Sequence, residues 1–216
     1  MPPELFFYPF LTPEQQELTD RSLQTLSFAR GQVVHRHGDA CVGVILILSG
    51  SLRFSVLSEE GREVTLFRAG AGDASVLSAA CVLQGIDLES HVTAETAARI
   101  LVLPAGVLAQ LMSENVDVER LVYRQAAEQY SRALLTMERI VFFSLEKRLA
   151  LFLREETLRL GSGSFRTTHE QIARCIGSSR EVVTRMLNQF SARRIVSLGR
   201  GTVTVIDPEA LEDISG

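Results

Sequence analysis

Short apolar runs separated by turn-forming residues dominate the first half of the chain. These runs cover residues 32–34, 42–48, 52–57, 64–67, 91–94 and 99–103, and glycines separate many of them. Such spacing is typical of an all-β sandwich or barrel. A tight turn is expected at Ser49-Gly50 and a hairpin tip at Glu60-Gly61, because glycine accepts the backbone angles that such turns require.

Helical patterns flank this β region. Thr12 is a suitable N-cap and Pro13 suits the first helical position, so a short helix is expected near the N-terminus. Pro104 opens a further helix. A much longer one is expected over residues 116–143, which contain no proline or glycine and would extend about 42 Å.

The apolar positions of this long segment form a stripe, but not a clean heptad repeat. Gln125, Gln129 and Arg132 interrupt the stripe. A dimerisation helix with a polar centre fits the pattern, and so does a helix that packs only against its own domain. Beyond it, the pattern predicts a helix over residues 145–160, a breaker at 161–164, then a strand, two helices, a hairpin and a short final helix.

Composition adds one asymmetry to this picture. The chain has 216 residues, of which 46% are hydrophobic and 22% charged, as in ordinary soluble globular proteins. Its formal net charge of −4 excludes nucleic-acid binding by bulk positive charge. Residues 166–200, however, hold seven arginines and two glutamates, so this segment carries +5 and the remainder −9. A basic patch of this kind fits a nucleic-acid-binding module, and a solvated arginine face remains the alternative.

The three cysteines, Cys41, Cys81 and Cys175, are widely spaced and form no Cys-x-x-Cys pair. Neither a metal site nor a disulfide framework is therefore expected. The first residues do not resemble a signal peptide, and no apolar stretch approaches the about 20 residues that span a bilayer. We expect a cytoplasmic protein without membrane association.

The strongest motif lies at residues 167–190, which read as two helices joined by a turn. Thr168 and Gln171 form a capping-box pattern at the first helix, and Gly177 suits the tight turn. Ser178 or Ser179 would cap the second helix. Its apolar face would pack inward, namely Val182, Val183, Met186, Leu187 and Phe190.

The opposite face of this second helix suits the reading of DNA bases. Arginine can donate two hydrogen bonds to guanine, and glutamate can accept one from cytosine. In helix-turn-helix proteins the N-terminal end of the second helix enters the major groove of double-stranded DNA. The expected base contacts are Ser179, Arg180, Glu181, Thr184 and Arg185.

Contacts to the DNA backbone are expected around this face, because phosphate contacts add affinity without specificity. The candidates are Thr168, Ser178, Asn188, Arg193, Arg194 and Arg200. Arg200 stands at the Gly199-Arg200-Gly201 tip of a hairpin over residues 195–207, where a wing would follow the two helices.

With these residues the chain resembles the Crp/Fnr family of bacterial regulators over essentially its full length. The run Ser179 to Arg185 looks like the family's recognition-helix motif, Arg-Glu-x-x-x-Arg, with Thr184 where one branch has serine. The resemblance implies an α+β fold in three parts: a β-roll or jelly-roll sensor domain (1–113), a dimerisation helix (114–143) and a winged helix-turn-helix (144–216). It also implies a homodimer on a palindromic operator whose half-sites contain TGA.

The resemblance implies an effector pocket in the β-roll near Gly72, Asp73, Ser75, Leu88, Glu89 and His91. Members that bind cyclic AMP have an Arg-Ser/Thr pair where this chain has Leu88-Glu89. A carboxylate would face a phosphodiester where a guanidinium is needed, so the expected small-molecule effector is not cyclic AMP. Too few cysteines are present for the family's iron–sulfur cluster.

Other sensing chemistries stay open. His35, His37 and His91, with Cys41 and Cys81, include candidate haem ligands, although a surface histidine pair and buried small cysteines are the simpler interpretation. Cys81 or Cys175 could act as a redox switch.

Two competing hypotheses accompany a ligand-gated regulator. A constitutive DNA-binding protein with a vestigial sensor would bind its operator without any metabolite. An enzyme finds no support, because no nucleophile–base pair, metal-ligand cluster or phosphate loop is present. The sequence leaves open the effector, the target genes and activation versus repression; an activator would also contact RNA polymerase.

Overall fold

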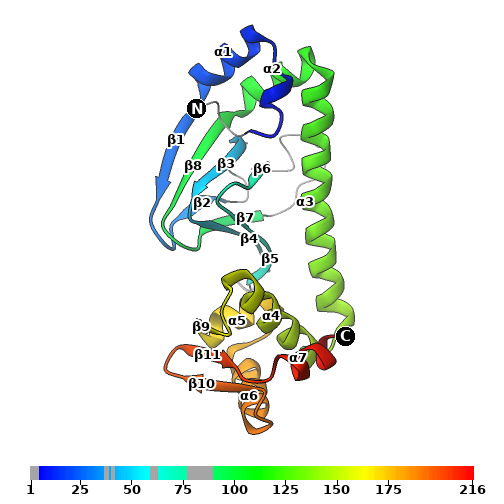
Figure 1. Ribbon diagram of the computed structural model, residues 1–216. Coiled ribbons are helices and arrows are strands. Elements are labelled where there is room, and N and C mark those ends of the chain that lie inside the picture. Colours follow the sequence, from blue (N-terminus) through cyan, green and yellow to red (C-terminus); the bar gives the residue numbers. More distant parts are fainter. Residues whose placement is uncertain (1–4, 37–38, 40–41, 59–62, 77–89) are drawn as a thin grey trace. The chain divides into compact units, whose positions relative to one another are not determined.

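The computed structural model describes residues 5–36, 39, 42–58, 63–76 and 90–216. The chain has the α+β architecture that the sequence predicts: antiparallel β-sheets, one long helix and a C-terminal helix-turn-helix (Figure 1). It divides into two compact units. The first comprises Met1–Ser58 and Leu66–Leu134, and the second Glu59–Thr65 and Leu135–Gly216.

Two four-stranded sheets form the β-roll. One has the order β1-β8-β3-β6 and the other β2-β7-β4-β5. The strands are β1 (Gln24–Phe28), β2 (Val33–His35), β3 (Gly43–Ser49), β4 (Ser51–Leu57), β5 (Glu63–Gly70), β6 (Ala74–Val76), β7 (Ser90–Ala94) and β8 (Ala98–Pro104). Between the sheets lies an apolar core built by alternate residues of these strands, including Ile45, Ile47, Leu52, Phe54, Val92 and Ile100.

The predicted turn at Ser49-Gly50 is confirmed. Gly50 joins β3 to β4 with φ +83°, and a Cβ at this position would lie 2.2 Å from the carbonyl oxygen of Ala97. Only glycine fits such a close approach without distortion. The tip expected at Glu60-Gly61 lies outside the described residues.

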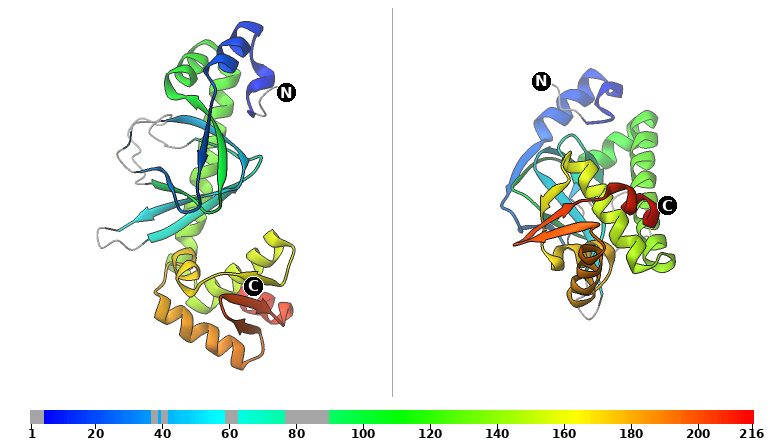
Figure 2. Two further views of the ribbon diagram at one scale, coloured as in Figure 1. Left: turned by 90° about the vertical axis from the view of Figure 1, so that its left-hand side faces the viewer. Right: turned by 60° about the horizontal axis from the view of Figure 1, so that its bottom comes forward.

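Helices cover one end and one side of the first unit. They are a 3-10 turn (Tyr8–Phe10), α1 (Pro13–Ser22), α2 (Ala105–Glu114) and α3 (Val116–Phe142). As predicted, Thr12 caps α1, its hydroxyl accepting from the Gln15 N–H in a capping box. Figures 1 and 2 show α3 running alongside the β-roll.

The inner face of α3 differs from the polar seam considered above. Val118, Val122 and Ala126 are buried in the first unit. Gln125 donates from its side-chain amide to the Ala74 carbonyl at 2.8 Å, and Gln129 donates to the Ser75 hydroxyl. These two glutamines therefore join α3 to β6, instead of forming the centre of a dimer stripe.

The second unit is a helix-turn-helix with a small sheet. Its elements are α4 (Leu145–Leu160), β9 (Ser164–Arg166), α5 (His169–Ile176), α6 (Arg180–Ala192), β10 (Val196–Gly199), β11 (Thr202–Val205) and α7 (Pro208–Ser215). The strands pair in the order β10-β11-β9. The predicted sequence of strand, helix, turn, helix, hairpin and final helix is confirmed throughout this unit.

Candidate nucleic-acid interface

Local sequence fixes the geometry of the helix-turn-helix. Thr168 caps α5 by accepting a hydrogen bond from the Gln171 N–H at 3.1 Å, while the Gln171 side chain accepts from the Thr168 N–H at 2.8 Å. Gly177 ends α5 in the left-handed region with φ +63°. Because a side chain there would be strained, glycine sets the turn between α5 and α6.

Helix α6 begins at a serine cap and buries one side. Of the two predicted caps, Ser179 is the one used, since its hydroxyl accepts from the Val182 N–H at 3.4 Å. Val183, Leu187 and Phe190 are completely buried in the core of the second unit. This anchored side leaves the opposite face of α6 directed to solvent, on the outside of the unit (Figure 2).

The solvent face of α6 carries the residues predicted to read bases. Ser179, Arg180, Glu181 and Arg185 are all exposed within the first two turns, whereas Thr184 is half-buried. Hydrogen bonding from the backbone and from the Ser179 hydroxyl, together with nearby Arg180, holds the pKa of Glu181 below its usual range. Glu181 therefore remains an ionised acceptor, as pairing with a cytosine amino group requires.

His169, which the sequence interpretation missed, is the first residue of α5. Its Nδ1 lies 2.8 Å from the hydroxyl oxygen of Thr184 on α6. The same hydroxyl lies 2.8 Å from the carbonyl oxygen of Arg180, to which it donates. A capping box followed by a histidine marks the position in sequence, but only the crossing of α5 and α6 brings the two side chains together.

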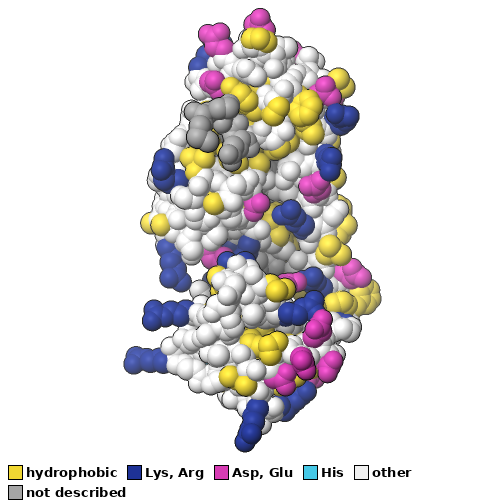
Figure 3. All heavy atoms as spheres, in the orientation of Figure 1, with side chains coloured by type: hydrophobic (Ala, Val, Ile, Leu, Met, Phe, Trp, Pro, Cys, Tyr) yellow, Lys and Arg dark blue, Asp and Glu magenta, His cyan; other side chains and the backbone are white. Residues whose placement is uncertain are grey.

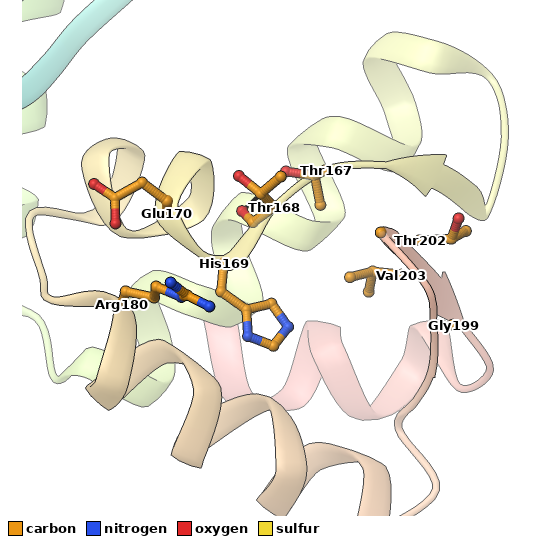
Figure 4. A pocket seen from close by; sticks show the side chains of 9 residues that line it. Thr167, Thr168, His169, Glu170, Arg180, Gly199, Thr202 and Val203 are labelled. Atoms are coloured by element: carbon orange, nitrogen blue, oxygen red, sulfur yellow. Dashed lines mark hydrogen bonds between the residues drawn. The ribbon is translucent and has the colours of Figure 1, made fainter.

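A cavity of about 430 Å³ adjoins this contact. It lies where the start of α5, the start of α6 and the hairpin β10–β11 meet, and it is lined by polar side chains, two glycines and Val203 (Figure 4). The ring of His169 points into it, between Arg180 and the hairpin residues Thr202 and Val203.

The predicted backbone contacts fall into two groups. Arg194, Asn188 and Arg200 are exposed, and Lys and Arg side chains project from the surface of the second unit (Figure 3). Two others already have partners within the chain. The Thr168 hydroxyl serves the helix cap, and Arg193 pairs with Glu146 on α4.

The candidate effector residues are distributed over both sheets. Gly72 lies in the turn before β6 with φ +90°. Asp73 accepts a hydrogen bond from the Gly70 N–H at 2.8 Å, so its carboxylate closes that turn. Ser75 is buried against Gln129, and His91 lies half-buried on β7 in the other sheet.

Leu88 and Glu89 lie outside the described residues, as do His37, Cys41 and Cys81. His35 is buried and Cys175 half-buried. Within the described ranges, no group of three or more His, Cys, Asp or Glu is arranged to hold a metal ion. None of the described helices combines the length and apolar character that crossing a bilayer requires.

Comparisons with known proteins match both units. A cyclic nucleotide-binding domain model matches residues 25–115, and a Crp-like helix-turn-helix domain model matches residues 147–214. A solved structure of a Crp/Fnr-family protein from Eubacterium rectale is 35% identical, with a TM-score of 0.92 and 98% coverage of each chain.

Two curated relatives match the chain at lower sequence identity. The global nitrogen regulator of a Nostoc species is 26% identical over 86% of each chain. The cyclic AMP receptor protein of Thermus thermophilus is 27% identical over 95% of this chain and 94% of its own.

Proposed function

We propose that this chain, which belongs to the Crp/Fnr family of DNA-binding transcription regulators, binds a palindromic operator as a homodimer under the control of a small molecule other than cyclic AMP. The family consists of transcription regulators, not enzymes. The exposed Arg-Glu-x-x-x-Arg face of α6, opposite the completely buried Val183, Leu187 and Phe190, is the observation that carries the proposal.

Arg180, Glu181 and Arg185 supply the chemistry for reading bases. The two guanidinium groups can each donate two hydrogen bonds to guanine O6 and N7, and the Glu181 carboxylate can accept one from a cytosine amino group. Guanine and cytosine recognised in this way fit a TGA core and its complement. Each such pair contributes about 1–3 kcal/mol of discrimination between bases.

Phosphate contacts around this face would fix the register of the protein on the duplex. The exposed side chains of Asn188, Arg194 and Arg200 suit this role, with Thr168 and Ser178 near the N-terminal ends of α5 and α6. We assign Arg193 a weaker contribution, because its guanidinium already pairs with Glu146.

The homodimer is supported by a second apolar stripe on α3. Exposed apolar residues recur along this helix with alternating spacings of four and three, the period of a coiled-coil seam. They are Tyr123, Ala127, Tyr130, Leu134, Met137 and Val141. This stripe is separate from the buried one formed by Val118, Val122 and Ala126, so α3 can pack against the β-roll and a second copy at once.

The dimer has a direct test in the sedimentation behaviour of two matched variants. Leu134→Glu introduces a charge into the seam, and we expect it to shift the protein toward a monomer. Leu160→Glu is the control, since Leu160 on α4 has a similar exposed fraction, 45% against 47% for Leu134. Equal sedimentation of both variants and the wild type would remove the support that the stripe gives.

The effector proposal rests on the β-roll. Ser75 and the Ala74 carbonyl hydrogen-bond to glutamines of α3, which links the β6 region to the proposed dimer helix. An effector bound near β6 would thus act on α3, provided that it binds the two states of the dimer with different affinities. Calorimetric titration with cyclic AMP should give no saturable heat, whereas saturable binding would overturn this part of the proposal.

A DNA-binding regulator acts on the bacterial genome, so we place the protein in the cytoplasm. If the protein activates transcription, RNA polymerase is a further partner. Division into a sensor domain (1–113), a dimerisation helix (114–143) and a DNA-binding domain (144–216) is part of the same proposal.

Selection of binding sites from random DNA tests the function. We expect an inverted repeat with TGA half-sites. Arg180→Ala and Arg185→Ala should each weaken binding to the selected site by about 5-fold to 150-fold. Arg120→Ala removes the same charge from an exposed position on α3 and should leave that affinity unchanged. Recovery of no inverted repeat would contradict the proposal.

A further inference from the structure

We propose that His169 is a positioning residue for base reading: it fixes the side chain of Thr184 and thereby decides which base pair Thr184 accepts in the operator. This inference rests on the proposed function, because it assumes that α6 enters the major groove. It concerns a contact between two helices that no base-contact motif includes.

The hydrogen-bond inventory of the contact determines which atom carries the proton. A threonine hydroxyl has one proton to donate and two lone pairs to accept with. Thr184 donates its proton to the Arg180 carbonyl oxygen at 2.8 Å. In the arrangement that satisfies both contacts, the Nδ1 of His169, 2.8 Å from the same oxygen, is the donor. In the neutral ring this leaves Nε2 without a proton, and the imidazole has a single defined tautomer.

The contact also selects one rotamer of Thr184. Threonine in a helix divides between two χ1 rotamers, because its hydroxyl can bond to carbonyl groups one turn earlier. The hydrogen bond from His169 favours the rotamer that satisfies both partners. Ordering of this half-buried side chain is then complete before DNA arrives.

Thr184 in this state presents a restricted chemistry to the groove. Its hydroxyl proton is used, so it offers one acceptor lone pair and a methyl group. In the major groove both an A·T and a G·C pair present an amino donor, but only A·T adds the thymine methyl, and the guanine edge presents two acceptors. Thr184 held by His169 therefore rejects a guanine edge, since the hydroxyl has no proton left for O6 or N7, and its methyl group favours an A·T pair through contact with the thymine methyl.

Base-pair substitutions across the selected operator test this assignment. His169→Ala should lower the preference for A·T over G·C about fivefold, the worth of one typical hydrogen bond, at one base pair of each half-site. Positions read by Arg180, Glu181 and Arg185 should keep their preferences. His169→Asn should restore the wild-type profile, because its amide N–H can take the place of Nδ1–H.

A double-variant comparison separates positioning from general loss of structure. Thr184→Val keeps the shape but removes the hydroxyl, so adding His169→Ala to Thr184→Val should change the preference at this base pair no further. A uniform loss of affinity at all positions, or no change at any, would overturn the role of His169. If the wild type discriminates bases and His169→Ala does so identically, the proposed function stands and this inference alone fails.

A measurement without DNA gives a second readout. Nitrogen-15 NMR of the histidine side chains in mildly alkaline buffer should show the proton of His169 on Nδ1 in the wild type, and loss of that preference in Thr184→Val. A proton on Nε2 in the wild type would overturn the inference whatever the DNA data show. Absence of any base discrimination by the wild type would instead reject the proposed function and the role of His169 together.

Discussion

Replacing Arg194 by glycine should stabilise the second unit and weaken DNA binding at the same time. Arg194 follows the end of α6 and has φ +61°; it is the one non-glycine residue with positive φ among those described. Its N–H donates to the Ser191 carbonyl at 3.0 Å, and the Ile195 N–H donates to the Phe190 carbonyl at 2.9 Å. This is the left-handed helix end at which glycine is usually found.

The size of the effect follows from the backbone. The left-handed conformation costs a residue with a Cβ about 1–2 kcal/mol, a cost that glycine avoids. The greater conformational freedom of glycine in the unfolded chain offsets about 0.5–1 kcal/mol of that gain in stability. Arg194→Gly should therefore raise the free energy of unfolding of the second unit by about 0.5–1 kcal/mol. Arg194→Ala keeps the strain and removes the same charge, so it is the matched control and should give no such gain.

Native-state hydrogen exchange of amides in the core of the second unit, such as that of Val203, measures the stability difference without requiring two-state unfolding of the whole chain. Both variants should lose one phosphate contact and lower the slope of log affinity against log salt by about 1. Equal stability of the glycine and alanine variants would refute the backbone argument. An unchanged salt slope in both would refute the phosphate contact.

Other consequences concern the turn, the core and the helix cap. Gly177→Ala should destabilise the second unit by about 1–2 kcal/mol or more, because φ is +63° at this position and the alanine Cβ would lie 3.2 Å from the Ile140 side chain. The loss should appear as faster amide exchange, and unchanged exchange would contradict it. Phe190→Ala should cost about 3–5 kcal/mol by the same measurement, since Phe190 is completely buried, and a loss below about 1 kcal/mol would contradict close packing. The pKa of Glu181 should lie below the ordinary glutamate range, so its stabilising contribution is present above the unfolded-state pKa and is lost as pH falls through the lower folded-state value. Ser179→Ala should raise this pKa in an NMR titration, because it removes a hydrogen bond to the carboxylate. An unchanged pKa would show that the Ser179 hydroxyl does not lower the pKa of Glu181.

The helix-turn-helix could be predicted because its determinants are local. Thr168 and Gln171 are three residues apart, Gly177 sets its own turn, and the buried residues of α6 follow the helical period. Each of these determinants involves residues within one or two helical turns of each other, so it can be recognised in the sequence without knowledge of distant contacts.

Elements that depend on distant partners were missed. β1 (Gln24–Phe28) is largely exposed, and only Leu26 and Phe28 alternate with polar residues in it, so its pairing with β8 left a weak signal in the sequence. β6 (Ala74–Val76) is three residues long and is fixed by pairing with β3. The prediction that placed the first strand at residues 32–34 therefore overlooked the strand before it.

The two faces of α3 and the role of His169 have the same explanation. The sequence shows apolar and polar residues mixed along α3, and only the position of the β-roll separates the buried stripe from the exposed one. Gln125 and Gln129 interrupt neither stripe once their hydrogen bonds to β6 are known. His169 and Thr184 are fifteen residues apart, so their contact depends on how α5 crosses α6.

The most direct measurement is the ratio of the dissociation constants for scrambled DNA and for the selected operator, at one moderate salt concentration, in wild type and Arg180→Ala. We predict a wild-type ratio of about 1,000 or more and a ratio about 5-fold to 150-fold lower in the variant. The affinity of the variant for scrambled DNA should fall by no more than the loss of one phosphate contact would cause. A wild-type ratio near unity, or an equal ratio in both proteins, would contradict base reading by α6.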